Sequence, residues 1–307
     1  MKRLSVIFCT YNRDRYIYKA IKSVVDQNYP RNNFEILIIN NNSTDRTEKI
    51  SNQAILDFTE TDIKHYIEPQ QGLSYARNRG IEESQGEIVI FVDDDATVFE
   101  PDYLLSIDEF FKNYPDAVAC GGPIIPVYEA EKPSWLSHYT EQLIGGALYM
   151  GKKIKQFKKG KYPGGGNSAY KKDVFEKYGL FNVELGRKGS GLIGAEEKDF
   201  YDRFYKAEVP FYYLPKMGIY HYISRKKLTT DHFKELTYSI GKSERIRTKN
   251  ISEKEFKKRI NAEYKKWIVS FILFFGYLFV LSPQKGWKLL QFRWYVTQGL
   301  KGKSLQF

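Results

Sequence analysis

Apolar runs of strand length alternate with segments of helical periodicity over the first hundred residues. Continuous runs of about five apolar residues are typical of strands that are buried on both faces of a parallel sheet. Four runs have this character, the third more weakly: 4–9, 34–39, 63–67 and 88–92. Apolar residues recur at helical spacing over 16–25 and 73–84, and Ser43 or Thr44 is expected to cap a helix that ends near residue 58. This order predicts an α/β fold with a mostly parallel central sheet flanked by helices.

Polar residues follow three of these runs at the point where each strand is expected to end. Thr10 and Tyr11 follow the first run, Asn40 and Asn41 the second, and three aspartates at 93–95 the last. Open α/β sheets bind ligands at the carboxyl ends of such strands. Three adjacent carboxylates repel one another, and a divalent cation with oxygen ligands offsets that repulsion. The pattern favours a metal site over the alternative, an acidic turn in solvent.

No glycine-rich phosphate loop follows the first strand. Neither the dinucleotide fingerprint nor a Walker-type lysine loop occurs there. A nucleotide bound at this edge would therefore have its diphosphate neutralised by a metal at the acidic triplet rather than by backbone amides. Dehydrogenases and P-loop enzymes are disfavoured for the same reason.

Seven segments, in the same order along the chain, resemble the motifs of family 2 glycosyltransferases with the GT-A fold. These segments are 5–13 SVIFCTYNR, 40–45 NNNSTD, 72–80 GLSYARNRG, 93–95 DDD, 164–170 GGGNSAY, 194–200 GAEEKDF and 220–221 YH. The resemblance extends over roughly residues 1–247. A single motif of this kind is weak, whereas seven in order are a strong signal.

The resemblance implies a nucleotide-sugar donor at the strand ends and a Mn²⁺ or Mg²⁺ ion. Seven residues would bind the donor: Thr10, Tyr11, Asn40, Asn41, Arg77, Asp93 and Asp94. Three would ligate the metal: Asp93, Asp95 and His221. Of the donor residues, Tyr11 and the asparagine pair would hold the base, with Arg77 nearby. The predicted donor nucleotide is UDP. Family members usually carry an Asp where this chain has Asn40 and Asn41, and this departure leaves the identity of the nucleobase open.

The resemblance also places the chemistry in the second half of the chain. Glu196 and Glu197 match a Glu-Asp motif whose second member is the general base of an inverting transfer. Glu197 is therefore the predicted general base, and Glu196 is the second predicted catalytic residue. A carboxylate can deprotonate an acceptor hydroxyl as it attacks. Gly165, Gly166 and Asn167 are expected to form the floor of the sugar and acceptor site, the alternative being an ordinary loop.

Lysines are dense just before these glycines. Six of the ten residues at 152–161 are lysine. Such a segment would attract an anionic acceptor, such as a lipid-linked diphosphate sugar. A solvated hairpin explains the same pattern equally well, and the sequence leaves both possibilities open.

The C-terminal region is strongly basic and contains one long apolar run. The chain has a net charge of +11, while residues 225–307 hold 19 Lys and Arg against 6 Asp and Glu. The uncharged run 267–281 is shorter than the ~20 residues of a spanning helix, and basic and tryptophan residues flank it. This pattern predicts a segment that lies in the membrane interface, with a buried helix as the alternative. The aromatic residues form one apolar block, which disfavours nucleic-acid binding.

We therefore predict a GT-A domain over 1–225, with a nucleotide-sugar half at 1–115 and an acceptor half at 116–225, followed by a helical, membrane-associated region at 226–307. Cys9 and Cys120 lie in apolar runs, and together with a first strand that begins almost at once they indicate a cytoplasmic location at the inner face of the membrane. The predicted activity is metal-dependent transfer of a sugar to a saccharide or lipid-linked acceptor. A nucleotidyltransferase and a non-catalytic membrane scaffold are the alternatives.

Overall fold

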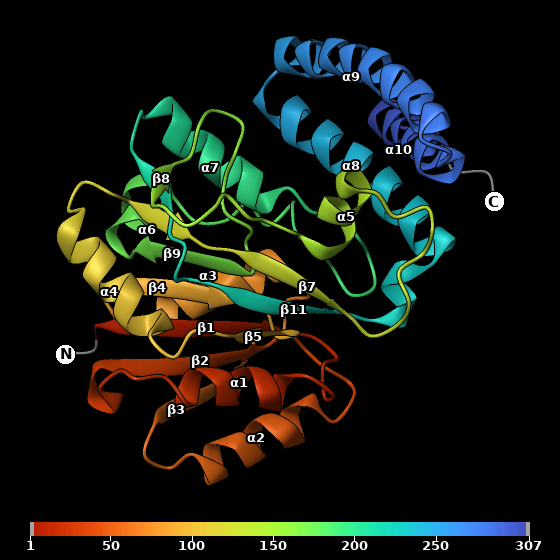
Figure 1. Ribbon diagram of the computed structural model, residues 1–307. Helices are drawn as coiled ribbons and strands as arrows, with labels where there is room; N and C mark the ends of the chain where they lie inside the picture. Colours follow the sequence, from red (N-terminus) through yellow and green to blue (C-terminus); the bar gives the residue numbers. More distant parts are fainter. Residues whose placement is uncertain (1–2, 305–307) are drawn as a thin grey trace. The chain divides into compact units, whose positions relative to one another are not determined.

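The computed structural model describes residues 3–304 and divides the chain into two compact units (Figure 1). The first unit combines Met1–Val127, Ala147–Val183 and Glu197–Tyr222. The second combines Tyr128–Gly146, Glu184–Glu196 and Ile223–Phe307. The long C-terminal stretch of the second unit begins close to the boundary predicted at 225, and two short earlier segments join it.

An eight-stranded sheet forms the centre of the first unit, with the strand order β3-β2-β1-β4-β9-β6-β10-β8. The strands are β1 Leu4–Thr10, β2 Phe34–Asn40, β3 Asp62–Ile67, β4 Ile88–Val92, β6 Ala119–Gly121, β8 Lys155–Gln156, β9 Asn167–Lys171 and β10 Phe211–Tyr213. The neighbours from β3 to β4 are parallel, whereas β9 runs antiparallel to both β4 and β6. The predicted α/β fold with a mostly parallel sheet is confirmed.

Helices cover both faces of this sheet because the strand side chains alternate between two hydrophobic cores. Phe8 packs in the core that contains α1 Ile17–Val25, α2 Thr47–Asp57 and α4 Tyr103–Asn113, whereas Ile7 packs in the opposite core. The opposite core contains α3 Leu73–Glu83, α6 Asp173–Tyr178 and α7 Glu196–Lys206. Gly80 lets α3 approach the sheet closely, since a Cβ there would lie 2.6 Å from Ile7 Cγ2.

A second, three-stranded sheet has the order β5-β11-β7, with β5 Ala96–Val98, β11 Ile219–Ile223 and β7 Ile124–Tyr128. β5 begins directly after the acidic triplet and pairs antiparallel with β11, which sets His221 opposite Ala96. The pairing brings residues that are more than 120 positions apart in the sequence to one place.

The second unit is helical. It contains α5 His138–Gly145, α8 Thr230–Ile251, α9 Glu253–Phe279 and α10 Pro283–Lys301. The crossing of α8 and α10 is close, because a Cβ on Gly241 would lie 2.1 Å from the Val296 carbonyl oxygen. Between residues 3 and 304, no helix combines the length and the apolar character that crossing a bilayer requires. The helical C-terminal region predicted from the sequence is confirmed.

Candidate active site

The acidic triplet lies where β4 ends and β5 begins. Asp94 and Asp95 are buried, and Asp93 is half-buried. The Asp93 amide donates to the carbonyl of Gly166 over 3.0 Å, because β9 pairs antiparallel with β4 and brings its preceding loop alongside. Strand pairing therefore places the carboxylates and the glycine loop 164–166 next to each other.

Asp93, Asp95 and His221 form a group that could hold a metal ion. One ligand atom from each residue lies within 4.8 Å of the others. His221 Nε2 is 3.1 Å from Asp95 Oδ1. Two carboxylate oxygens and one imidazole nitrogen form a ligand set compatible with Mn²⁺, and they leave coordination positions for a diphosphate. The structure thus brings together all three residues that were predicted as metal ligands.

Asp94 lies outside the metal-ligand group and pairs with Arg13. Arg13 Nε lies 3.3 Å from Asp94 Oδ1 and 3.8 Å from Asp95 Oδ2. Burial raises the pKa of Asp94 to about 7, and the Arg13 guanidinium acts in the opposite direction. Arg13 thus ties the loop after β1 to the triplet. Arg13 belongs to the segment 5–13, the first of the seven motif-like segments. Its pairing with Asp94 was not predicted, because sequence spacing does not show which carboxylate a long side chain reaches.

The two strand-end asparagines bond to their own loops. The Asn41 amide donates to the carbonyls of Glu68 (3.0 Å) and Gln70 (2.8 Å), and its oxygen accepts from the Gly72 amide at 2.7 Å. The Asn40 oxygen accepts from the Ser43 amide at 3.0 Å. These bonds occupy both Asn41 amide hydrogens, so that side chain holds the loop before α3. The predicted role of Asn40 and Asn41 in holding the nucleobase stays a prediction.

Thr10 and Tyr11, also predicted to bind the donor, lie at the end of β1. Thr10 is 1% exposed, and Tyr11 is half-exposed. Tyr11 is thus accessible to a ligand at this strand end, while Thr10 is enclosed by the protein. Their predicted role in holding the donor stays a prediction.

Arg77 pairs with the predicted base. Its Nη2 atom lies 3.0 Å from Glu197 Oε1, and its guanidinium lies 5.7 Å from the ring centre of Phe91 and 5.2 Å from that of Phe181. Arg77 is 3% exposed. A buried arginine between two aromatic rings has little freedom to move, so it fixes the orientation of the Glu197 carboxylate. The structure thus places Arg77 beside Glu197. Its predicted place near the nucleobase stays a prediction.

The glycine loop touches both the acids and the predicted base. A Cβ on Gly165 would lie 1.9 Å from Glu197 Oε1, and one on Gly166 would lie 1.9 Å from the Asp93 carboxylate. Only glycine permits this approach of backbone to side chain. One short loop therefore borders the metal-ligand group on one side and Glu197 on the other.

Asn167 does not face the site as predicted. It is fully buried, and its amide nitrogen lies 3.1 Å from the Pro123 carbonyl oxygen and 2.7 Å from that of Met217. Its oxygen accepts from the Tyr103 hydroxyl at 2.9 Å. With these partners Asn167 anchors the end of the glycine loop and has no contact to offer an acceptor. Tyr103, which the sequence reasoning missed, belongs to this anchor.

The neighbouring acids of α7 differ in their surroundings. Glu196 is 3% exposed and falls in the second unit, whereas the side chain of Glu197 is 23% exposed and meets Gly165. Asp199 pairs with Arg203 one helical turn later, at 2.7 Å. Of these three acids, Glu197 is the one that lies at the glycine loop.

The family model of glycosyl transferase family 2 matches residues 5–179, which is more than half of the chain. Together with the strand order and the acidic strand end, this match shows that the chain belongs to glycosyl transferase family 2.

A relative in Haloferax volcanii, the glucosyl-dolichyl phosphate glucuronosyltransferase, is 30% identical over 209 residues, which make up 66% of this chain and 64% of that protein. This chain therefore spans less than two thirds of that relative's length.

Two solved structures share the fold. The mannosyltransferase PcManGT from Pyrobaculum calidifontis, in complex with GDP-Man and Mn²⁺, superposes with a TM-score of 0.63 at 16% identity, covering 98% of this chain and 88% of that one. Residues 1–349 of TarS from S. aureus, in complex with UDP, give a TM-score of 0.52 at 16% identity, covering 99% and 93%. At this identity the likeness shows the GT-A fold, which the sequence had predicted.

Proposed function

We propose that the protein is a metal-dependent, inverting glycosyltransferase that moves a sugar from a nucleotide donor to a hydroxyl of a saccharide or lipid-linked acceptor. The observation that carries this proposal is the glycine loop 164–166, which borders both the Asp93, Asp95 and His221 group and Glu197. A leaving-group site and a base on either side of one loop are what sugar transfer needs.

Asp93, Asp95 and His221 would hold Mn²⁺ or Mg²⁺, and the ion would neutralise charge on the leaving diphosphate. The ligand atoms lie close enough to share one ion. The Mn²⁺ complex of the related fold in PcManGT supports this assignment. Arg13, paired with Asp94 at 3.3 Å, would keep the triplet in place when the donor binds.

Glu197 would accept the proton of the acceptor hydroxyl. That oxygen would form the new bond to the anomeric carbon from the face opposite the departing diphosphate, so the configuration would invert. The pairing with Arg77 at 3.0 Å would orient one carboxylate oxygen and leave the other for the proton. Geometry of this kind matters, because a carboxylate acts as a base only within hydrogen-bond reach of the proton.

We further propose UDP as the nucleotide of the donor. The complex of TarS with UDP supports this choice, whereas PcManGT carries GDP-Man. A thermal-shift screen of UDP- and GDP-sugars, with and without Mn²⁺, tests it. Stabilisation by a UDP-sugar only when Mn²⁺ is present supports the proposal. Stabilisation by GDP-sugars alone would contradict the choice of UDP, and stabilisation by none would contradict the donor site.

Substitution of Arg77 by Lys keeps the charge but removes the planar fork that holds Glu197. We expect turnover to fall by roughly 10- to 100-fold, since misplacing a catalytic group by about 1 Å has effects of this size. Affinity for UDP and Mn²⁺ should not change. Steady-state kinetics with a parallel calorimetric titration of UDP measure both quantities.

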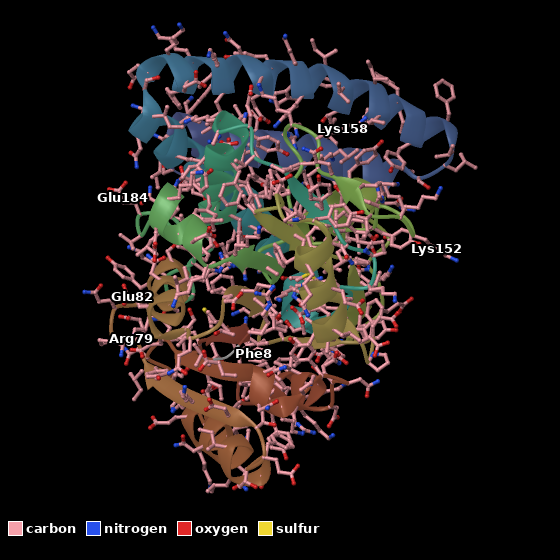
Figure 2. The ribbon with its side chains drawn as sticks, turned by 90° about the vertical axis from the view of Figure 1, so that its left-hand side faces the viewer. Phe8, Arg79, Glu82, Lys152, Lys158 and Glu184 are labelled. Carbon is pink, nitrogen blue, oxygen red and sulfur yellow. The ribbon has the colours of Figure 1, made fainter. Side chains whose placement is uncertain are left out.

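Arg79→Lys is the matched control for this prediction. Arg79, which is labelled in Figure 2, lies on the same helix. It pairs with Glu83 at 2.7 Å. This variant should keep wild-type turnover. A loss of UDP affinity in Arg77→Lys would instead support the predicted place of Arg77 near the nucleobase of the donor.

We also propose that the C-terminal helices attach the protein to the cytoplasmic face of a membrane. Large apolar side chains of α9 are exposed at helical spacing, including Ile268 (63%), Ile272 (65%) and Phe275 (55%). The apolar residues after the helix are more exposed still, with Leu281 at 90%. The alternative of a helix whose apolar run is buried is therefore wrong for these positions. An exposed stripe of this kind with lysines beside it suits an anionic lipid surface.

The opposite side of α9 is fixed within the second unit by buried charges. Arg259 bonds Glu244 of α8 at 2.8 Å and Glu263 at 2.7 Å, and Arg293 of α10 bonds Glu263 at 2.9 Å. All of these side chains are less than 10% exposed. Removing α9 and α10 would leave Glu244 without the Arg259 partner, so point substitutions test membrane binding better than truncation.

The triple variant Ile268→Ser, Ile272→Ser, Phe275→Ser should lose vesicle binding and keep its fold. Burying one such side chain stabilises by roughly 1.5–3 kcal/mol, so three should weaken binding by well over tenfold. Sedimentation with phosphatidylglycerol vesicles measures the effect. Leu56→Ser with Leu180→Ser changes exposed apolar residues of the first unit and should bind normally. Equal binding by the triple variant would exclude α9 as the membrane contact.

A further inference from the structure

The lysine-rich segment 152–161 lies at the edge of the large sheet and turns at 158–161, where the Lys161 amide donates to the Lys158 carbonyl at 2.9 Å; we call this segment the hairpin. β8 pairs antiparallel with β10, and Tyr212 faces Gln156. Phe157 is buried and stacks on Phe211, with 5.7 Å between ring centres. The Phe157 amide also donates to the Phe211 carbonyl at 3.0 Å. One buried aromatic residue thus anchors the segment while the lysines around it face solvent.

The charge of this hairpin has no internal compensation. All six lysines are exposed: Lys152, Lys153, Lys155, Lys158, Lys159 and Lys161. Residues 151–163 contain no Asp or Glu, and none of the six lysines forms an ion pair with a carboxylate anywhere in residues 3–304. Figure 2 shows Lys152 extending away from the ribbon. A concentrated positive charge of this kind attracts anions.

The hairpin is attached to the elements that carry the proposed active site. The Tyr205 hydroxyl of α7 contacts the carbonyls of Lys158 and Lys161, and Glu197 lies in the first turn of the same helix. Tyr162 stacks on Tyr201 of α7, with ring centres 5.7 Å apart. Lys161 and Gly164, the first residue of the glycine loop, are three residues apart in the sequence. Their Cα atoms can therefore be at most about 11 Å apart.

We propose that the hairpin 152–161 binds the phosphate or diphosphate of a lipid-linked acceptor, an inference that rests on the proposed function. Lysine ammonium groups bind phosphate as point charges. The metal that Asp93, Asp95 and His221 would hold would neutralise the donor's diphosphate, which would leave the hairpin for a second anionic group. The hairpin contacts α7, the helix that carries Glu197, through Tyr205, and Gly165 of the following loop meets Glu197. A phosphate bound there would therefore lie on the side of the proposed base, where the acceptor would bind.

A membrane surface fits the hairpin less well than a phosphate does. Its apolar side chains are Phe157, which is buried, and Ile154, which is 39% exposed. Stable interfacial binding needs apolar side chains that enter the lipid, and these are on α9. A single-stranded nucleic acid would need exposed aromatic rings for stacking, which the hairpin does not offer.

Calorimetric titration with farnesyl diphosphate, in EDTA and low salt, tests this inference. EDTA removes divalent ions, so the diphosphate cannot bind through the metal group. We compare Lys158→Gln with Lys159→Gln against Lys49→Gln with Lys177→Gln, which removes two exposed lysines of the same unit. We expect affinity to fall by roughly three- to tenfold in the hairpin variant only. Inorganic pyrophosphate should behave in the same way, which separates recognition of phosphate from recognition of the lipid chain.

The outcomes distinguish the hairpin from the proposed function. Equal affinity in both variants would overturn the inference, as would loss of phosphatidylglycerol vesicle binding with unchanged affinity for farnesyl diphosphate. Both variants should keep Mn²⁺-dependent binding of UDP. Failure of wild-type protein to bind UDP with Mn²⁺ would count against the glycosyltransferase assignment itself, whatever the hairpin binds.

Discussion

Asp95→Ala should abolish Mn²⁺-dependent binding of UDP while the protein stays folded. The substitution removes one of three proposed ligands and the partner of His221, which lies 3.1 Å away. Substitutions around a metal site that spare the ligands already weaken metal affinity by roughly 10- to 100-fold, so loss of a ligand should weaken it by at least that much. Calorimetric titration of UDP with Mn²⁺ measures the effect, and circular dichroism checks the fold.

The matched control for this prediction is Asp116→Ala, which removes an exposed carboxylate of the same unit. The control should bind UDP and Mn²⁺ as the wild type does. Unchanged affinity in Asp95→Ala would show that the acidic triplet does not hold the ion. An equal loss in both variants would point to a general effect of charge rather than to a ligand.

Glu197→Gln should lower turnover by ~10²–10⁴ and leave UDP affinity nearly unchanged. Glutamine keeps the shape of the side chain and an oxygen that can still accept from Arg77, but it cannot take up the acceptor's proton. Initial rates and UDP titrations measured on the same preparation separate the two effects. Loss of both turnover and UDP binding would mean that Glu197 holds the donor.

Glu196→Gln and Asp199→Asn are the comparisons for the base. Asp199 is paired with Arg203 on the same helix, so its substitution should have little effect on the rate. If Glu196→Gln is the variant that loses turnover, the base has been assigned to the wrong member of the pair. The greater exposure of the Glu197 side chain and its contact with Gly165 favour Glu197.

The sequence predicted four of the eight strands of the central sheet, β1 to β4, and three of them are continuous apolar runs. β1, β2 and β4 are each buried along nearly their whole length, and that burial is visible in the pattern of residue types. The strands β5 and β11 were not predicted, because β5 has only three residues and β11, with His221 at its centre, is not a continuous apolar run. His221 was consequently linked to the aspartates by family resemblance, and the pairing of β5 with β11 now gives the physical reason.

Local hydrogen bonds were harder to predict than strands. Ser43 or Thr44 was expected to cap α2, and this prediction was wrong, because the helix begins at Thr47 and the Asp45 carboxylate accepts from the Thr47 amide at 2.9 Å. Asn42, Ser43, Thr44 and Asp45 are all favoured capping residues, so residue type could not decide among them. The hydrogen-bond partners of Asn41 could not be predicted for a related reason, since Glu68, Gln70 and Gly72 lie in a loop that is distant in sequence.

The assignment of Arg77 shows the limit for long side chains. The motif placed it correctly on α3, but its guanidinium reaches Glu197, 120 residues further along. Packing against Phe91 and Phe181 helps to hold the guanidinium in that direction. The sequence therefore identified most residues near the site, while the structure was needed to say which of them contact one another.

Release of UDP from a UDP-sugar tests the central claim most directly. Purified protein, a panel of UDP-sugars and acceptor-bearing membranes are incubated with Mn²⁺ or with EDTA, and the nucleotide products are separated by chromatography. We predict that UDP appears with Mn²⁺, disappears with EDTA, and is reduced by ~10²–10⁴ in Glu197→Gln. Release of pyrophosphate would indicate a nucleotidyltransferase. No Mn²⁺-dependent UDP from any donor would contradict the assignment of this site to sugar transfer.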